Sequence, residues 1–269
     1  MKLGEDLKSK LKDLISFFQH KKAIIAFSGG VDSSLLAFLS AKYAEETLLI
    51  TARSLIYPES DLMDAEQFSR KYNIHHEFLD FDLLDNVAFA NNPKNRCYLC
   101  KKALYKELIS IKEENDFDVI VDGSNSDDLK EFRPGKKAIE ELGIETPYVY
   151  YNITKQDIRK LSNYFNLKSA LKPSMACYAS RIPYDQEINK KKIEMIQKAE
   201  IFLRKTFGLT QLRVRMHKGN LARIELLKEE FYKILELEEL SCIGERFRSL
   251  GFKYTTLDIN GFRSGSLDE

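Results

Sequence analysis

The sequence has no long apolar run and no low-complexity tract. No apolar run reaches the length that spans a bilayer, and residues 1–12 mix charged with apolar residues instead of forming the apolar core of a signal peptide. We therefore expect a cytoplasmic protein with no membrane partner. With 43% hydrophobic and 31% charged residues, the 269-residue chain can bury a sizeable core in one large or two small domains.

The sequence also has almost no net charge and few cysteines. The formal net charge is +1, so no overall field attracts nucleic acid, and we expect no nucleic-acid partner. The longest cationic run, residues 190–192, is typical of a solvated helix face. Only four cysteines are present. In a cytoplasmic protein, cysteines favour catalysis or metal binding over structural disulfides.

Apolar runs and helical patterns alternate along the first part of the chain. Strands are predicted at 23–27, 47–52, 75–81, 118–121 and 148–150, and helices at 5–20, 33–44, 59–72, 97–114, 136–142 and 154–165, the last with Thr154 as N-cap. The strands are continuous apolar runs and are separated by helices. This pattern predicts an α/β fold with a parallel sheet covered by helices on both faces.

The pattern changes near residue 185. Residues 168–186 contain two prolines and are predicted to form an ordered loop. A helix at 188–207, strands at 211–216 and 221–227, a helix at 229–249 and a strand at 253–258 follow, with a hairpin turn at 218–220. We therefore predict two domains, an α/β domain over 1–184 and a smaller C-terminal α+β domain over 185–269.

A glycine loop directly after the first predicted strand is the most informative motif. It consists of Ser28, Gly29, Gly30, Val31, Asp32, Ser33 and Ser34. Adjacent glycines let backbone N–H groups approach an anion, and the start of a helix adds further donors. A carboxylate beside a phosphate makes sense mainly as a Mg²⁺ ligand, which is the role we expect for Asp32. The loop has no lysine, so it is neither GxxxxGK[ST] nor GxGxxG.

Polar residues also follow two other predicted strands. Ligands of parallel sheets bind at the carboxyl ends of the strands, where Arg53 and Ser54 are expected to contact adenine or ribose and Gly123 to contact the nucleotide. Asp127 and Asp128 follow Gly123 closely. They can bind Mg²⁺ or the ribose, or cap the next segment, and we expect Asp128 to be a magnesium ligand.

Two cysteines stand at i and i+3 at the start of a predicted helix. Cys97 and Cys100 can therefore face the same way and gain from the helix dipole. A zinc site completed by Cys242 or a histidine is an alternative, although none of the histidines has metal-ligand spacing. A redox pair is another, although this CxxC does not follow a strand. Cys242 itself is expected to be a core residue.

Arginines near the C-terminus are candidates for phosphate binding. Arg213 and Arg215 alternate along a predicted strand, so both side chains face one side of the sheet and can fork onto a phosphate. Arg263 and Ser264 form a further donor cluster, although surface salt bridges are the alternative for each arginine.

Two acidic residues are less clear. Glu200 and Glu225 are candidates for metal or substrate contact. For Glu200, a solvated helix face is the alternative.

Several strings together resemble the LarE family of ATP-dependent sulfur transferases, within the PP-loop ATP pyrophosphatase superfamily. Beside SGGVDSS they are NPKNRCYLCK at 92–101, DGSNSDD at 122–128, RPG at 133–135, CYASRIPY at 177–184, RVR at 213–215, ARIE at 222–225 and GFRSGSL at 261–267. The resemblance runs from about residue 20 to the C-terminus and implies the adenine nucleotide alpha hydrolase-like fold.

The resemblance implies a reaction in two steps. ATP·Mg²⁺ adenylates a carboxylate of pyridinium-3,5-biscarboxylic acid mononucleotide and releases pyrophosphate, and a sulfur nucleophile then displaces AMP. The thiocarboxylate product is a precursor of the nickel-pincer cofactor of lactate racemase. The family also implies a homo-oligomer, with substrate binding and oligomerisation in the C-terminal domain.

Members of the family obtain the sulfur in one of two ways. The resemblance identifies Cys177 as the reactive cysteine. Ser180 and Arg181 follow it closely, so we expect them to bind the anionic end of the substrate. Some members sacrifice the sulfur of their own cysteine, whereas others hold a [4Fe–4S] cluster on three cysteines and depend on a sulfur donor. Because Cys97, Cys100 and Cys177 supply three thiolates, and a sacrificial Cys177 would leave the other two unexplained, we favour the cluster.

Other readings remain open. A tRNA thiolation enzyme or an amide-forming synthetase shares the PP-loop, but the first usually needs a basic surface for tRNA. A nucleotide-sensing or metal-carrying protein without turnover is an alternative of a different class, which predicts ATP binding without AMP formation.

Overall fold

The computed structural model describes residues 3–130, 134–172, 176–263 and 265–266. The chain forms two compact units. The first consists of Met1–Ser54, Glu59–Asp82 and Asn95–Met175, and the second of Leu55–Pro58, Leu83–Lys94 and Ala176–Glu269. The domain boundary between residues 184 and 185 stays a prediction, because compact units need not coincide with domains.

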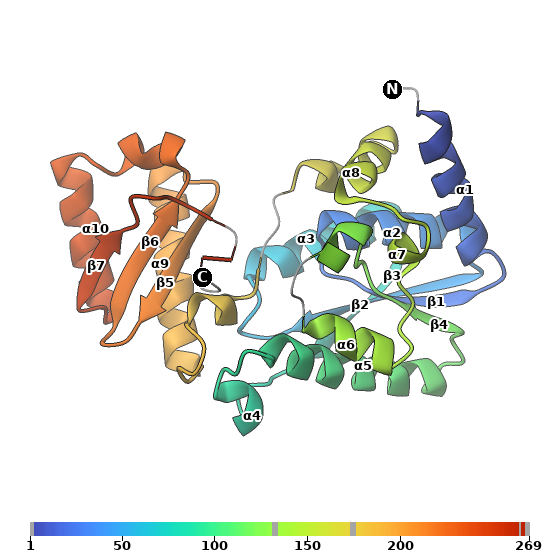
Figure 1. Ribbon diagram of the computed structural model, residues 1–269, viewed down its shortest axis with the longest axis horizontal. Helices are drawn as coiled ribbons and strands as arrows, with labels where there is room; N and C mark the ends of the chain where they lie inside the picture. The colour runs from blue at the N-terminus through green and yellow to red at the C-terminus, as the bar shows by residue number, and fades with distance from the viewer. Residues whose placement is uncertain (1–2, 131–133, 173–175, 264, 267–269) are drawn as a thin grey trace. The chain divides into compact units, whose positions relative to one another are not determined.

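The first unit is built on a parallel sheet. Its strands are β1 (Lys22–Ala26), β2 (Glu46–Arg53), β3 (His75–Asp80) and β4 (Val119–Val121), in the order β3-β2-β1-β4, and every neighbouring pair is parallel (Figure 1). This confirms the predicted α/β class.

Helices cover both faces of this sheet. They are α1 (Glu5–Phe18), α2 (Val31–Tyr43), α3 (Glu59–Tyr72), α5 (Arg96–Glu114), α6 (Gly135–Glu141), α7 (Pro147–Tyr150) and α8 (Lys155–Tyr164). In β1, Ala23 and Ile25 belong to one hydrophobic core and Ile24 to the other, and all three side chains are fully buried. Burial on both faces explains why this strand is a continuous apolar run.

The strand predicted at 148–150 is wrong, because these residues form the short helix α7. The chain makes a single parallel bridge between Glu145 and Val121, and Pro147 then occupies the start of the helix, where its missing N–H costs nothing. The Tyr148 hydroxyl donates to the carbonyl oxygen of Asp32 at 2.9 Å. Helix α8 begins after Thr154, which is the predicted N-cap and forms a capping box with Asp157.

The second unit holds a smaller mixed sheet. Strands β5 (Leu212–His217), β6 (Leu221–Leu226) and β7 (Tyr254–Leu257) lie in the order β5-β6-β7, with β5 antiparallel and β7 parallel to β6. Helices α4 (Val87–Ala90), α9 (Lys190–Phe207) and α10 (Leu237–Leu250) belong to the same unit. This confirms the predicted smaller α+β part.

The helix predicted at 229–249 is two elements. A 3₁₀ helix, Lys228–Lys233, is followed by α10, which begins after an extended N-cap residue, Glu236. Between them the backbone leaves the helical conformation, with Ile234 at φ −129° and Glu236 at ψ 153°, and Ile234 is buried. Among the described residues, no helix is both long and apolar enough to cross a bilayer.

Candidate functional site

The glycine loop connects β1 to α2 at the carboxyl edge of the parallel sheet. Gly29 has φ +66°, and a Cβ at this position would lie 3.1 Å from the backbone nitrogen of Ala65 and from the carbonyl oxygen of Asp61, both on α3. A side chain here would therefore be strained and would crowd the backbone of α3. Ser33 Oγ accepts from the backbone N–H of Ser28 at 3.2 Å and contacts Ser28 Oγ at 3.1 Å. These contacts fix the loop against the start of α2.

The loop after β4 packs on the same helix start. A Cβ on Gly123 would lie 3.2 Å from both Asp32 Cβ and the backbone nitrogen of Ser33. The structure thus brings Gly123, predicted to contact the nucleotide, against the glycine loop. Ser34 Oγ is buried with no hydrogen-bond partner among the described residues, so it is a donor that a ligand can use.

Asp32 has the features of a cation ligand. Its Oδ2 is ion-paired with the ammonium of Lys155, while its Oδ1 is buried and has no hydrogen-bond partner among the described residues. Burial raises the pKa of Asp32, the charge of Lys155 opposes this shift, and Asp128 raises the pKa further. A carboxylate oxygen that has no hydrogen-bond partner and is repelled by a second carboxylate is a suitable ligand for Mg²⁺. Asp32 and Asp128 are therefore suitable residues to hold this ion.

Sequence reasoning missed Lys155. It stands 123 positions from Asp32 in the chain, and nothing in its local sequence distinguishes it from other lysines.

Asp122 fixes the loop that follows β4. Its carboxylate accepts from Lys101 Nζ at 3.1 Å, from the backbone N–H of Ser124 at 2.8 Å and from the hydroxyls of Tyr105 and Ser124. Burial by itself raises the pKa of Asp122, but the Lys101 charge and these hydrogen bonds outweigh it and lower the pKa to about 2. The carboxylate therefore stays ionised and holds the loop beside the start of α2.

The residues expected to contact adenine or ribose lie at the end of β2. The Arg53 guanidinium makes two hydrogen bonds to Asp80, at 2.6 and 2.7 Å, and both side chains are exposed. Ser54 follows directly and ends the first segment of this unit. Their contact with a nucleotide stays a prediction.

The four cysteines are free thiols in different settings. Cys97 and Cys100 lie in the first turns of α5, in the first unit, whereas Cys177 is the N-cap residue of a 3₁₀ helix, Tyr178–Arg181, in the second. Cys242 on α10 is exposed, so the expectation that it is a core residue is wrong. The part of the chain that the structure describes contains no group of three or more His, Cys, Asp or Glu side chains that could hold a metal ion.

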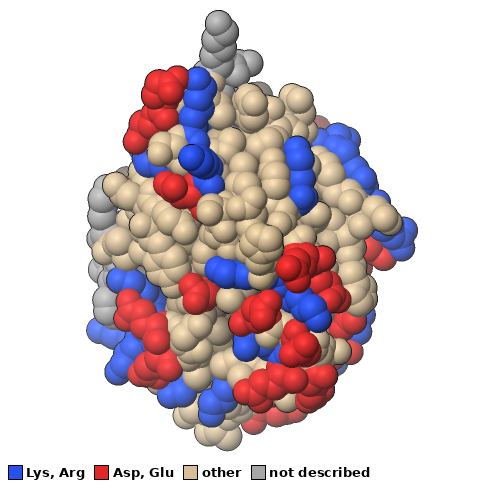
Figure 2. All heavy atoms as spheres, turned by 90° about the vertical axis from the view of Figure 1, so that its right-hand side faces the viewer, with Lys and Arg blue, Asp and Glu red and all other residues tan. Residues whose placement is uncertain are grey.

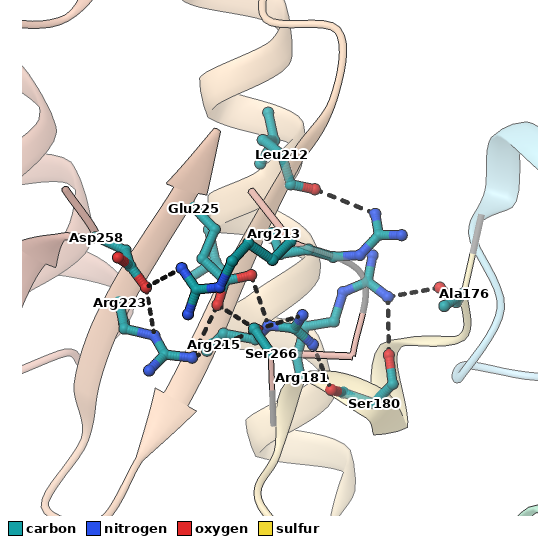
Figure 3. A network of polar contacts seen from close by, with 12 residues as sticks. Ala176, Ser180, Arg181, Leu212, Arg213, Arg215, Arg223, Glu225, Asp258 and Ser266 are labelled. Carbon is teal, nitrogen blue, oxygen red and sulfur yellow. Dashed lines mark hydrogen bonds and ion pairs between the residues drawn. The ribbon is translucent and has the colours of Figure 1, made fainter. Parts of the chain in front are cut away.

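Arg181 holds the backbone at Cys177. Its side chain is fully buried and makes two hydrogen bonds to Glu200, at 2.9 and 3.1 Å. The same guanidinium donates to the carbonyl oxygens of Ala176 at 2.6 Å (Figure 3) and Cys177 at 3.0 Å. Glu200 is also fully buried, so the alternative of a solvated helix face is wrong. Sequence periodicity missed this because the partner that allows burial comes from another element.

The two arginines of β5 are both buried, but their partners differ. Arg215 donates to Glu225 Oε2 at 3.0 Å and to the carbonyl oxygen of Ser180 at 2.7 Å. Arg213 donates to the carbonyl oxygen of Leu212 at 3.2 Å and stacks on Phe262, with no carboxylate ion pair among the described residues.

The electrostatics of Arg213 suit an anion. Burial and the neighbouring charge of Arg181 lower the pKa of Arg213 to about 10, so the guanidinium is charged at neutral pH. The charges of Arg181, Arg215 and Arg204 repel it, while the carboxylate of Glu200 attracts it. An anion would relieve this repulsion. Arg263 lies 3.7 Å from Asp258, and Ser264 lies outside the described residues.

We predict that Asp122 contributes a pH-dependent part of the stability. Its pKa is lower in the folded chain than the ordinary 3.8, so the stabilisation is complete above the ordinary value and is lost as pH falls through about 2. A shift of this size corresponds to about 2 kcal/mol. Urea unfolding of wild type and Asp122→Asn should show a stability difference that narrows from about pH 5 to about pH 2. A difference that is independent of pH would contradict this.

Comparisons with known proteins extend over nearly the whole chain, although no family model matches it. The uncharacterized protein slr1717 of Synechocystis is 37% identical over 97% of this chain and 98% of that protein. The pyridinium-3,5-bisthiocarboxylic acid mononucleotide synthase of Lactiplantibacillus plantarum is 29% identical over 98% of this chain and 92% of that protein. A tRNA-specific 2-thiouridylase of Ehrlichia ruminantium is 26% identical over only 56% of this chain and 51% of that protein. Together with the glycine loop on a parallel sheet, these matches show that the chain belongs to the LarE family of PP-loop proteins.

Proposed function

We propose that the protein is an ATP-dependent sulfur transferase that converts a carboxylate of pyridinium-3,5-biscarboxylic acid mononucleotide into a thiocarboxylate, for nickel-pincer cofactor synthesis. The observation that carries this proposal is the match over 92% of a synthase whose name states the bisthiocarboxylic product. The geometry of the glycine loop and of the Cys177 segment supports it.

The first step is adenylation. The backbone N–H groups of the loop and of the start of α2 bind the β- and γ-phosphates, as helix N-termini bind anions. Asp32 and Asp128 would hold Mg²⁺, which would neutralise phosphate charge when bound, while Arg53, Ser54 and Gly123 contact the nucleoside. A substrate carboxylate oxygen attacks the α-phosphorus, the bond to the β-phosphate oxygen breaks, and pyrophosphate leaves. AMP then becomes the leaving group that the free carboxylate lacked.

The second step is sulfur transfer. A thiolate or sulfide attacks the carbonyl carbon, a C–S bond forms, and the C–O bond to AMP breaks with the electron pair leaving on AMP. Arg213 binds the substrate phosphate, because it is a buried cation that forms no ion pair with a carboxylate among the described residues. Arg181 and Ser180 position the Cys177 backbone, since Arg181 and the Ser180 hydroxyl donate to its carbonyl oxygen at 3.0 and 2.8 Å.

For the sulfur source we propose a [4Fe–4S] cluster. Three thiolates suit a cluster with one open iron, which would supply sulfide when loaded. Cys97 and Cys100, one turn apart on α5, fit two of its ligands. Cys177, which belongs to the other unit, would be the third ligand. The iron and sulfide content of the protein tests this assignment. If Cys177 is instead the sacrificial donor, its Cβ–S bond breaks with loss of the Cα proton and leaves dehydroalanine.

A tRNA thiolation enzyme is the second candidate, because a tRNA 2-thiouridylase matches about half of the chain. On the face drawn in Figure 2, Lys and Arg side chains are interspersed with Asp and Glu, and no continuous positive surface appears there. Such a mixed surface disfavours tRNA binding on this face, because tRNA binding depends on many phosphate contacts.

We predict that Cys177→Ala separates the two steps. Substrate-dependent pyrophosphate release should continue at close to the wild-type rate, because the nucleotide residues are unchanged, while thiocarboxylate formation falls to background. Cys242→Ala, a substitution at an exposed thiol on α10, should change neither. Thiocarboxylate made by Cys177→Ala at the wild-type rate would contradict both sulfur mechanisms.

We also predict the metal content of protein purified without oxygen. About four irons and four acid-labile sulfides per chain are expected for a loaded cluster, and Cys97→Ala should lower both. If iron is absent and Cys177 loses its sulfur on turnover, the sacrificial mechanism holds instead. One zinc per chain would assign the CxxC pair to a structural site.

A further inference from the structure

The glycine loop has no lysine of its own, but a distant lysine lies against it. Lys172 Nζ donates to the carbonyl oxygen of Gly29 at 3.3 Å, although 143 positions separate the two residues. Both belong to the first unit. The Lys172 side chain is 17% exposed, so its ammonium is held close to the loop.

Two carboxylates of α3 hold the ammonium in this place. Lys172 Nζ lies 2.9 Å from Asp61 Oδ1 and 2.7 Å from Asp64 Oδ2. The same helix touches the loop, because a Cβ on Gly29 would lie 3.1 Å from the carbonyl oxygen of Asp61. Lys172, Asp61, Asp64 and Gly29 thus form one contiguous group, which we call the Lys172 cluster.

The ammonium is charged at any pH at which the protein works. Burial by itself lowers the pKa of Lys172, but Asp64 and Asp61 outweigh it, and the pKa is raised above its ordinary value. A lysine ammonium has three N–H donors. One of them is directed at the Gly29 carbonyl oxygen, and the ammonium also forms ion pairs with the two carboxylates.

These three acceptors are not equivalent. The carboxylates are charged, whereas the carbonyl oxygen of Gly29 is neutral, and an N–H donor gains roughly twice as much from a charged acceptor. A phosphate oxygen at the loop would therefore compete successfully for the donor that faces Gly29. This exchange needs only a rotation of the ammonium, and its ion pairs with Asp61 and Asp64 stay in place.

The two carboxylates would repel a phosphate bound at the loop if no cation lay between them and it. A cation placed between the carboxylates and the phosphate removes this conflict, and Lys172 lies at the loop in such a position.

We propose that Lys172 is a phosphate-binding residue of the nucleotide site and supplies from a distance the lysine that the loop lacks. Its ammonium binds a β- or γ-phosphate oxygen of ATP, and Asp61 and Asp64 position it. The inference rests on the proposed binding of ATP at this loop. It makes Lys172 a residue that distinguishes ATP and pyrophosphate from AMP, which has no β- or γ-phosphate.

The test is the affinity of the whole protein for three ligands, measured by calorimetry. Lys172→Met should weaken the binding of ATP·Mg²⁺ and of pyrophosphate about tenfold or more, the loss expected for one charge-assisted hydrogen bond, and leave AMP binding unchanged. Lys168→Met is the matched control, since Lys168 is an exposed lysine of the same segment. It should bind all three ligands as wild type does.

A second pair of variants separates phosphate binding from simple neutralisation of the two aspartates. Asp61→Asn with Asp64→Asn should bind ATP at least as tightly as wild type, and adding Lys172→Met should weaken binding about tenfold. If the triple variant binds ATP as tightly as the double variant, Lys172 only neutralises the aspartates and the proposal is overturned. Wild type that binds no ATP would overturn the proposed function as well, whereas equal ATP binding by wild type and Lys172→Met overturns this inference alone.

Discussion

The buried ion pair between Arg181 and Glu200 is the interaction on which the rest of the second unit depends. Both side chains are fully buried, and removing one partner of such a pair typically costs about 3–5 kcal/mol, because the other charge is left uncompensated. Glu200 on α9 also accepts from the backbone N–H of Val214 on β5 at 3.0 Å. The pair therefore joins the helix, the sheet and the segment that carries Cys177, and the proposed reactive thiol has a backbone held by the core of its unit.

Under the proposed function, the two units would use different chemistry for anions. In the first unit, backbone N–H groups at the glycine loop would bind the phosphates, and two lysines reach the loop from distant parts of the chain, with Lys155 on Asp32 and Lys172 on the Gly29 carbonyl oxygen. In the second unit, buried arginines are kept charged by carboxylates such as Glu225. This division suits the proposed reaction, in which pyrophosphate must leave in every turnover while the substrate phosphate stays bound through both steps.

The sequence predicted local structure well and long-range partners poorly. The helix at 59–72 has the predicted bounds, and Thr154 is the predicted cap, because both depend on neighbouring residues. Residues 148–150 look like a strand by composition, but Pro147 and the long-range hydrogen bond of Tyr148 make them helical. The burial of Glu200 depends on Arg181, a residue of another element. The roles of the candidate site residues stay predictions, which only ligand-bound chemistry can test.

The most direct test of the account follows all products of one reaction mixture. Anaerobically purified protein is incubated with ATP, Mg²⁺ and pyridinium-3,5-biscarboxylic acid mononucleotide, and in a parallel reaction with tRNA in place of the mononucleotide. AMP, pyrophosphate and thiocarboxylate are then quantified by liquid chromatography and mass spectrometry. We expect AMP and pyrophosphate in equal amounts, formed only with the pyridinium substrate and together with the thiocarboxylate. If AMP forms only when tRNA is present, or if neither substrate leads to AMP, the proposed function is contradicted.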